Sequence, residues 1–157
     1  AGAGVERFDP RLCRERLRGG PAHCRAASGV VYPRGLSTIR TDIRQQHGLV
    51  AERVGRVAAF LMYYVNQGIG HIAWMGVEPE HHRTGLGRAL VLELAEQLRR
   101  HDVRELRVET LGDSVDYEPY ARTRAFYRSL GFADFRRELL DNPECPELLE
   151  MMLVLQE

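Results

Sequence analysis

Apolar residues gather in short runs along the chain from residue 49 onward. Three runs, at 49–52 ("LVAE"), 57–65 ("VAAFLMYYV") and 71–77 ("HIAWMGV"), are separated by the segments "RVGR" and "NQGIG". Each separating segment contains Gly, which favours tight turns. Short apolar runs joined by such turns predict a meander of antiparallel strands.

The sequence after this meander alternates between helical and strand patterns. Residues 87–101 ("GRALVLELAEQLRRH") carry Leu at i+4 spacing, which predicts an amphipathic helix. Residues 105–111 ("ELRVETL") are typical of a buried strand. Residues 119–130 predict a second helix that ends at Gly131, with Phe132 placed for the hydrophobic contact that accompanies a C′ glycine. The segments "ADFRRELL" and "ELLEMMLVL" predict a final pair of strands.

The first third of the chain has weaker patterns. A helix is predicted to start near Asp9-Pro10 and to stop at Gly19-Gly20, and a second short helix is predicted over residues 36–46. The complete order is then helix, helix, three strands, helix, strand, helix and two strands. This order predicts an α/β (α+β) fold, with a mixed sheet flanked by helices. The chain has 157 residues, 44% of them hydrophobic, so we expect one core and a single domain over residues 5–157.

Charge and cysteine content exclude several classes of protein. The net charge is zero, so no overall basic field favours nucleic acid. All 22 basic residues are Arg, which excludes a catalytic lysine, a Schiff base and a P-loop lysine. The three cysteines have no zinc-binding spacing, and the pattern of a signal peptide or a long apolar run is not visible. We therefore expect a cytoplasmic protein with no metal, no nucleic-acid partner and no membrane contact.

The most informative segment runs from Val77 to Leu90. A strand ends at Val77, Pro79 stops it, and a loop with Gly85 and Gly87 leads directly into a helix. Glycines let the backbone approach a ligand closely, and a helix start offers unpaired N–H groups at the positive end of the helix dipole. This combination predicts a site for a phosphate-bearing anion that needs no lysine. An ordinary helix start with a Gly turn is the alternative, because neither the Rossmann nor the Walker spacing is present.

These residues resemble a motif of the GNAT superfamily of acyl-CoA-dependent N-acetyltransferases. The family pattern, an apolar strand, V-x-P and then [QR]-x-x-G-x-[GA], is matched by Val77, Pro79, His82, Gly85 and Gly87. A later family helix, N-x-x-A-x-x-[FL]-Y-x-x-x-G-F, corresponds to Tyr120, Thr123, Phe126, Tyr127, Gly131 and Phe132. His82, Tyr120 and Thr123 depart from the family residues. The resemblance covers roughly Leu49 to the C-terminus and implies a mostly antiparallel sheet with a splay between its two central strands.

The resemblance also implies how acetyl-CoA binds as co-substrate. The pyrophosphate would be held mainly by backbone N–H groups of the loop, from His82, Arg83, Thr84, Gly85, Leu86, Gly87 and Arg88. Backbone N–H groups near Met75, Gly76 and Val77 would polarise the thioester carbonyl, and Tyr120 takes the place of a contacting Asn. Tyr127 has the position of the general acid, because a phenol can protonate a departing thiolate. A core aromatic residue is the alternative for Tyr127.

The general base is open among three candidates. His71 occupies a strand position at which several family members place Glu, and an imidazole suits the deprotonation of an ammonium. It alternates onto one face of its strand with Met75 and Val77, although a solvent-exposed His at a strand end is the alternative. Glu109 is the rival, and many family members use only water. The acidic run at residues 113–118 would attract a cationic amine, unless it is simply a solvated loop.

We therefore predict an N-acetyltransferase that moves an acetyl group from acetyl-CoA to a primary amine of a small molecule or protein. The amine attacks directly in a ternary complex. A non-catalytic module that binds acyl-CoA or regulates a partner is the alternative. The partners are acetyl-CoA and the amine acceptor, and we expect a monomer or a homodimer.

Overall fold

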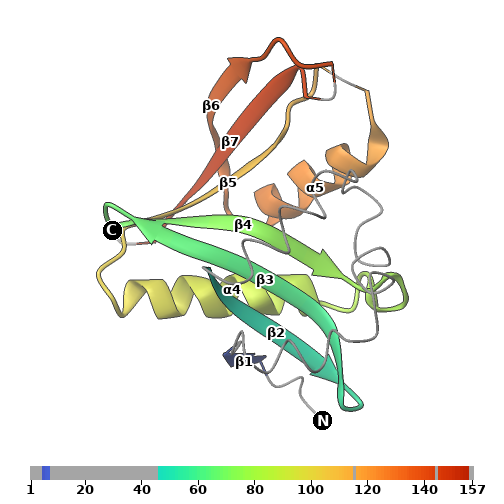
Figure 1. Cartoon of the computed structure of the whole chain (residues 1–157), viewed down its shortest axis with the longest axis vertical. Coiled ribbons are helices and arrows are strands. Elements are labelled where there is room, and N and C mark those ends of the chain that lie inside the picture. Colours follow the sequence, from blue (N-terminus) through green and yellow to red (C-terminus); the bar gives the residue numbers. More distant parts are fainter. Residues whose placement is uncertain (1–4, 8–45, 115, 144, 156–157) are drawn as a thin grey trace. The chain divides into compact units, whose positions relative to one another are not determined.

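The computed structural model describes residues 5–7, 46–114, 116–143 and 145–155 (Figure 1). In chain order the elements are β1 (Val5–Arg7), β2 (His47–Arg53), β3 (Arg56–Asn66), β4 (Ile69–Val77), the 3-10 turn η2 (Pro79–His81), α4 (Leu86–Arg99), β5 (Glu105–Leu111), α5 (Glu118–Ser129), β6 (Ala133–Leu139) and β7 (Glu147–Val154). From β2 onward this is the predicted order, and the mixed α/β class is confirmed. The helix predicted near residues 9–19, and all but the last residue of the one at 36–46, lie outside the described residues. Among the described helices, none is long and apolar enough to cross a membrane.

The described residues form two compact units. The first contains β1, β2, β3 as far as Tyr64, β4 from Ala73, η2, and α4 as far as Gln97. The second contains Val65–Ile72, which includes the turn between β3 and β4, and the described residues from Leu98 onward. The single domain expected over residues 5–157 stays a prediction.

The first unit is built on the predicted antiparallel meander. β1 pairs with β2, and β2 pairs with β3 in a register that places Leu49 opposite Leu61. Val54 and Gly55 join β2 to β3 with positive φ angles of 51° and 72°, as a two-residue hairpin turn requires. Apolar side chains from β2, β3 and α4 supply the core: Leu49, Ala51, Ala58, Ala59, Leu61, Met62, Leu86, Leu90, Val91, Leu94 and Ala95. The apolar stripe predicted for the helix at residues 87–101 is therefore confirmed in α4.

The second unit contains the parallel strand pair. The start of β4 runs parallel to β5, from Ile69 opposite Glu105 to Ile72 opposite Val108. The strands follow the order β4-β5-β7-β6 with antiparallel pairing from β5 onward, and α5 packs against β5 (Figure 1). The sheet is thus mixed and mostly antiparallel, as predicted. The predicted splay concerns the part of β4 after Ile72, which belongs to the first unit, and β5, which belongs to the second. It stays a prediction.

The two faces of β5 differ in character. Leu106 and Val108 are buried in the core, whereas Arg107 and Glu109 alternate with them and project to the other face. The antiparallel register places Glu109 opposite Glu150 of β7. The polar face of β5 therefore continues onto β7.

Candidate functional site

The loop between β4 and α4 contains two residues with left-handed backbone. After Val77 the chain makes the η2 turn and passes through Arg83 and Gly85, whose φ angles are positive at 62° and 86°. Left-handed residues in such a loop can turn successive backbone N–H groups toward an anion. Apart from Gly85 and its two chain neighbours, no atom of the described residues lies within 4 Å of the point where a Cβ at Gly85 would be. The space beside Gly85 is therefore open, and α4 begins directly after it at Leu86.

The start of α4 offers N–H groups to a ligand. The first bond of the helix joins the Ala89 N–H to the Gly85 carbonyl oxygen at 2.9 Å. The N–H groups of Leu86, Gly87 and Arg88 therefore have no partner within the helix. No acidic residue lies in the first turn of α4, and Arg88 is exposed there, so the positive end of the helix dipole is not neutralised.

His82, which replaces the family Gln or Arg, braces this loop. Its Nε2 donates a hydrogen bond to the Val77 carbonyl oxygen at 2.8 Å, and this bond fixes a proton on Nε2 because a carbonyl only accepts. The His82 N–H donates to the Pro79 carbonyl at 3.1 Å, and the Thr84 hydroxyl donates to the His81 carbonyl at 2.6 Å. The His82 amide and these two side chains thus hold the loop, which leaves the helix start as the stronger candidate for phosphate contacts.

The remaining predicted cofactor contacts lie in both units. Met75, Gly76 and Val77 form the end of β4 in the first unit, where Gly76 is buried. Tyr120 lies in the first turn of α5 in the second unit, and its ring centroid is 5.8 Å from that of Tyr117. The roles assigned to these four residues stay predictions.

Tyr127 lies in a buried aromatic group that the end of α5 holds in place. Its side chain is 3% exposed, and the ring centroids of Phe126 and Phe132 are 5.1 and 5.2 Å from its own. The Phe132 N–H donates to the Tyr127 carbonyl at 3.1 Å, the Gly131 N–H donates to the Arg128 carbonyl at 3.0 Å, and Gly131 has a φ of 93°. This is the Schellman motif expected at that glycine.

Burial disfavours the ionised form of Tyr127. Removal of the phenol from water raises the pKa of Tyr127 above its usual value, because the anionic form loses solvation. The phenol therefore stays protonated at neutral pH, as a proton donor must. A core aromatic residue would be buried in the same way, so the catalytic role of Tyr127 stays a prediction.

His71 and Glu109 share the charged face of the second unit. His71 on β4 lies opposite Arg107 on β5, and Glu109 lies opposite Glu150 on β7. Burial, and then the Arg107 guanidinium, lower the pKa of His71 from its usual value, while Glu150 and Glu109 act in the opposite direction. The structure thus brings the two candidate bases within electrostatic reach of each other. Tyr127 belongs to the buried aromatic group instead.

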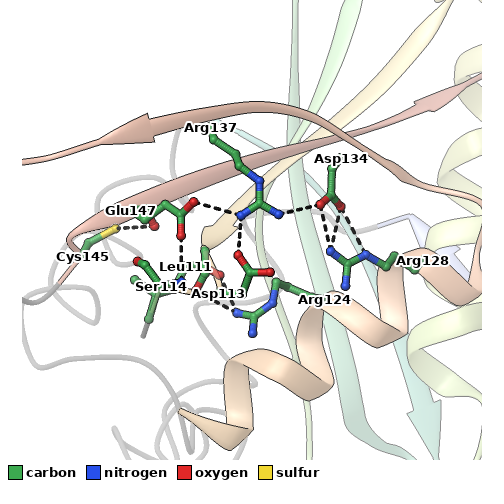
Figure 2. A network of polar contacts seen from close by, with 10 residues as sticks. Leu111, Asp113, Ser114, Arg124, Arg128, Asp134, Arg137, Cys145 and Glu147 are labelled. Carbon is green, nitrogen blue, oxygen red and sulfur yellow. Dashed lines mark hydrogen bonds and ion pairs between the residues drawn. The ribbon is translucent and has the colours of Figure 1, made fainter. Parts of the chain in front are cut away.

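An ion-pair network holds the segment that joins β5 to α5 (Figure 2). Arg137 of β6 pairs with Asp113, Asp134 and Glu147, and Figure 2 shows its guanidinium between the three carboxylates. Glu147 also accepts a hydrogen bond from the Ser114 N–H at 2.8 Å. Asp113 belongs to the acidic run that we expected to attract a cationic amine, and its carboxylate forms an ion pair with Arg137.

Three residues of these clusters escaped the sequence analysis. Arg124 is 6% exposed and donates from Nη1 to the carbonyl oxygens of Leu111 and Gly112 at 2.8 and 3.0 Å, which ties α5 to the end of β5 (Figure 2). Arg107 and Glu150 form the centre of the charged face beside His71. Glu150 interrupts the apolar run "ELLEMMLVL", a signal that could have drawn attention to it.

One group of possible metal ligands lies before the glycine loop. Glu78, Glu80 and His81 each bring a ligand atom within 4.8 Å of the others. All three are at least partly exposed, and such groups are common at protein surfaces without an ion. The expected absence of a metal stays a prediction.

A family model describes most of this chain. The model of the Acetyltransferase (GNAT) family matches residues 21–132. This range contains the glycine loop and Tyr127, and it begins upstream of Leu49, where the resemblance seen in the sequence starts. A comparison with curated proteins gave no match.

Several solved structures have a similar fold. A protein from Desulfovibrio desulfuricans assigned to the GNAT family of acetyltransferases is 21% identical, with a TM-score of 0.78 over 99% of this chain and 100% of that chain. The ribosomal-protein-S18-alanine N-acetyltransferase of Escherichia coli is 20% identical, with a TM-score of 0.72 over 99% of this chain and 96% of that one. A Bacillus subtilis acetyltransferase in complex with CoA is 12% identical, with a TM-score of 0.67 over 98% of this chain and 99% of that one. At these identities the likeness concerns the fold alone.

Proposed function

Because the chain belongs to the GNAT family of acetyltransferases and is therefore an acyltransferase, we propose that it transfers an acetyl group from acetyl-CoA to a primary amine. The acceptor is an amine of a small molecule or of a protein, and it attacks directly while both substrates are bound. The complex of the similarly folded Bacillus subtilis acetyltransferase with CoA supports acetyl-CoA as the donor.

The glycine loop and the start of α4 carry this proposal. The N–H groups of Leu86, Gly87 and Arg88 have no partner within the helix, and the positive φ of Gly85 opens the backbone beside them. Such a helix start binds phosphate groups through hydrogen bonds and through the helix dipole. The pyrophosphate of acetyl-CoA therefore has a binding site in a chain that contains no lysine.

In the proposed mechanism, acetyl transfer replaces the C–S bond of the thioester by a C–N bond and involves three proton transfers. The acceptor ammonium gives one proton to His71, and the electron pair of that N–H bond stays on nitrogen. The free amine attacks the thioester carbonyl carbon, whose oxygen is polarised by N–H groups near Met75–Val77. As the C–S bond breaks, Tyr127 gives its phenolic proton to the CoA thiolate. The second proton leaves the new amide nitrogen and replaces the one that Tyr127 gave, directly or through solvent.

His71 is the base that we prefer over Glu109. It is partly buried with a lowered pKa, so its neutral form, which has a free lone pair, is present at neutral pH. We expect His71→Ala to remove the acidic limb of the kcat/KM profile and to lower the rate on the order of tenfold or more. Glu109→Gln should keep that limb. The opposite pair of results, with the limb lost only in Glu109→Gln, would reassign the base to Glu109.

Calorimetry of CoA binding tests the proposed cofactor site. A Val side chain at Gly85 would fill the open space beside the helix start and block the phosphate groups. Gly55→Val is the matched control, because Gly55 also has positive φ (72°) and nothing described within 4 Å, but it lies in the turn between β2 and β3. We expect Gly85→Val to weaken CoA binding strongly and Gly55→Val to leave it unchanged. Equal affinity of folded Gly85→Val and wild type would rule out this site.

A further inference from the structure

Charged side chains from neighbouring strands form a connected cluster beside His71. His71 lies opposite Arg107 in the parallel register of β4 and β5. Arg107 lies between two carboxylates, with Nη2 2.7 Å from Glu105 Oε2 and Nη1 3.5 Å from Glu150 Oε1. Its Cζ is 4.4 Å from the ring centroid of Phe135 on β6. The guanidinium next to His71 is therefore held on three sides.

The contacts of Arg107 fix both its place and its charge. Nε and Nη2 both donate to Glu105 Oε2, at 3.0 and 2.7 Å, and the side chain is only 19% exposed. Hydrogen bonds to Glu105 are the main reason that the pKa of Arg107 is raised. A guanidinium does not lose its proton at physiological pH. Arg107 is thus a permanent and ordered positive charge opposite His71.

Glu150 is the buried counter-charge of this cluster. Its side chain is 6% exposed, and its Oε2 lies 3.4 Å from Nε of Arg136 on β6 without a hydrogen bond. Its other oxygen faces Arg107, and Glu109 lies opposite it in register. The carboxylate of Glu150 therefore opposes the effect of Arg107 on nearby groups.

We propose that Arg107 is a positioning residue that keeps the His71 imidazole neutral and ready to accept a proton, with Glu150 limiting this effect. The proposal rests on the proposed function, in which His71 deprotonates the acceptor ammonium. An imidazole near a fixed cation gains less from protonation, because the two positive charges repel each other.

The charges around His71 agree with this role. After burial, Arg107 is the main cause of the lowered pKa of His71, and Glu150 and then Glu109 raise it. Val65 and Asn66, which β3 contributes to this unit, carry no titratable side chain. Within the second unit, Arg107 and the two carboxylates thus act in opposite directions on the charge of His71, in addition to its burial.

An NMR titration of the histidine rings tests the proposal without any substrate. His71→Asn identifies the His71 signal among the 6 histidines. We expect Arg107→Gln to raise the pKa of His71 and Glu150→Gln to lower it, because each change removes one of the two opposing charges. Arg107→Lys keeps the positive charge and should restore most of the wild-type titration. Arg122→Gln, an exposed change on α5, is the control and should leave the titration unchanged.

The pH profile of kcat/KM provides the second readout. Its acidic limb should move to higher pH in Arg107→Gln and to lower pH in Glu150→Gln, in step with the NMR titration. An unmoved or lowered His71 pKa in Arg107→Gln overturns the proposal. If Arg107→Gln does not fold, an unchanged titration in Glu150→Gln overturns it instead. A titration that moves while the acidic limb stays fixed also overturns the positioning role.

The failure of the proposed function would be recognised separately. If the wild-type protein transfers no acetyl group to any amine, the enzymatic assignment fails. The NMR titration then still decides whether Arg107 controls the charge of His71.

Discussion

We expect Arg124 to be essential to the attachment of α5, and its replacement to lower stability and activity together. The guanidinium is buried and donates from Nη1 to two carbonyl oxygens, of Leu111 at 2.8 Å and of Gly112 at 3.0 Å. Arg124→Met retains most of the apolar stem and removes both donors. Tyr127 lies one helical turn further along α5, so a shift of this helix also displaces the proposed general acid.

The structure allows an estimate of the loss of stability. A buried acceptor that loses its partner costs about 1–3 kcal/mol, and two acceptors are affected. Part of this cost is offset, because burying the Arg guanidinium removes a charge from water, whereas burying Met does not. We therefore expect the free energy of unfolding to fall by about 2–4 kcal/mol. For a chain of this size, such a loss lowers Tm by roughly 5–15 °C.

Thermal unfolding followed by circular dichroism measures this change. Arg122→Met is the matched control on the same helix, because the Arg122 side chain is 79% exposed and, within the described part of the chain, pairs with Glu118 one turn away. Such a pair contributes about 0.2–0.5 kcal/mol, so Arg122→Met should melt close to the wild type. If Arg124→Met also melts within roughly 1 °C of the wild type, the two hydrogen bonds do not hold α5 and the reasoning is wrong.

Three further predictions concern the acid, a glycine and the response to low pH. Tyr127→Phe should keep acetyl-CoA affinity and lower kcat on the order of tenfold to a thousandfold, and an unchanged kcat in a steady-state assay would return Tyr127 to a packing role. Gly112→Ala should lower the urea midpoint, because a Cβ there would collide with the Glu147 carboxylate, and an unchanged midpoint would show that the carboxylate can move freely. The Ser114 N–H and then Arg137 hold the pKa of Glu147 below its usual value. The resulting stability is present above the unfolded pKa and is lost as pH falls through the folded pKa, so urea titrations should show a decline below about pH 4.5. Arg137→Gln should make this decline smaller, and an equal decline in both proteins would contradict the assignment.

The elements that the sequence predicted well are those with local signals. The strands of the meander are separated by turns that contain Gly55 and Gly68, both with positive φ, and α5 ends at Ser129, just before Gly131, as that glycine indicated. β1 was missed because it has three residues and its pairing depends on β2, which lies far along the chain. Periodicity and turn residues reveal local geometry, whereas such pairing depends on the folded chain.

The candidate site likewise has features that local sequence predicts and features that depend on strand pairing. The loop at Gly85 is contiguous in sequence, so its turn and the helix start after it could be predicted from residue types, while its binding of an anion stays a prediction. The pairing of Arg107 with Glu150 depends on the register of β5 against β7, which composition and spacing do not determine. Likewise the ion pair of Asp113 could not be predicted, because its partner Arg137 follows it by 24 residues. Ion pairs across strands therefore changed the electrostatics that the sequence had suggested.

The release of CoA thiol from acetyl-CoA tests the central claim most directly. The purified protein would be mixed with acetyl-CoA and a panel of primary amines that includes small amines and peptides, with the acetylated product quantified by mass spectrometry. We predict that at least one amine gives thiol and acetylated amine in equal amounts, at a rate far above that without protein. Tight binding of acetyl-CoA together with no thiol release above background for any amine would contradict the assignment as an N-acetyltransferase.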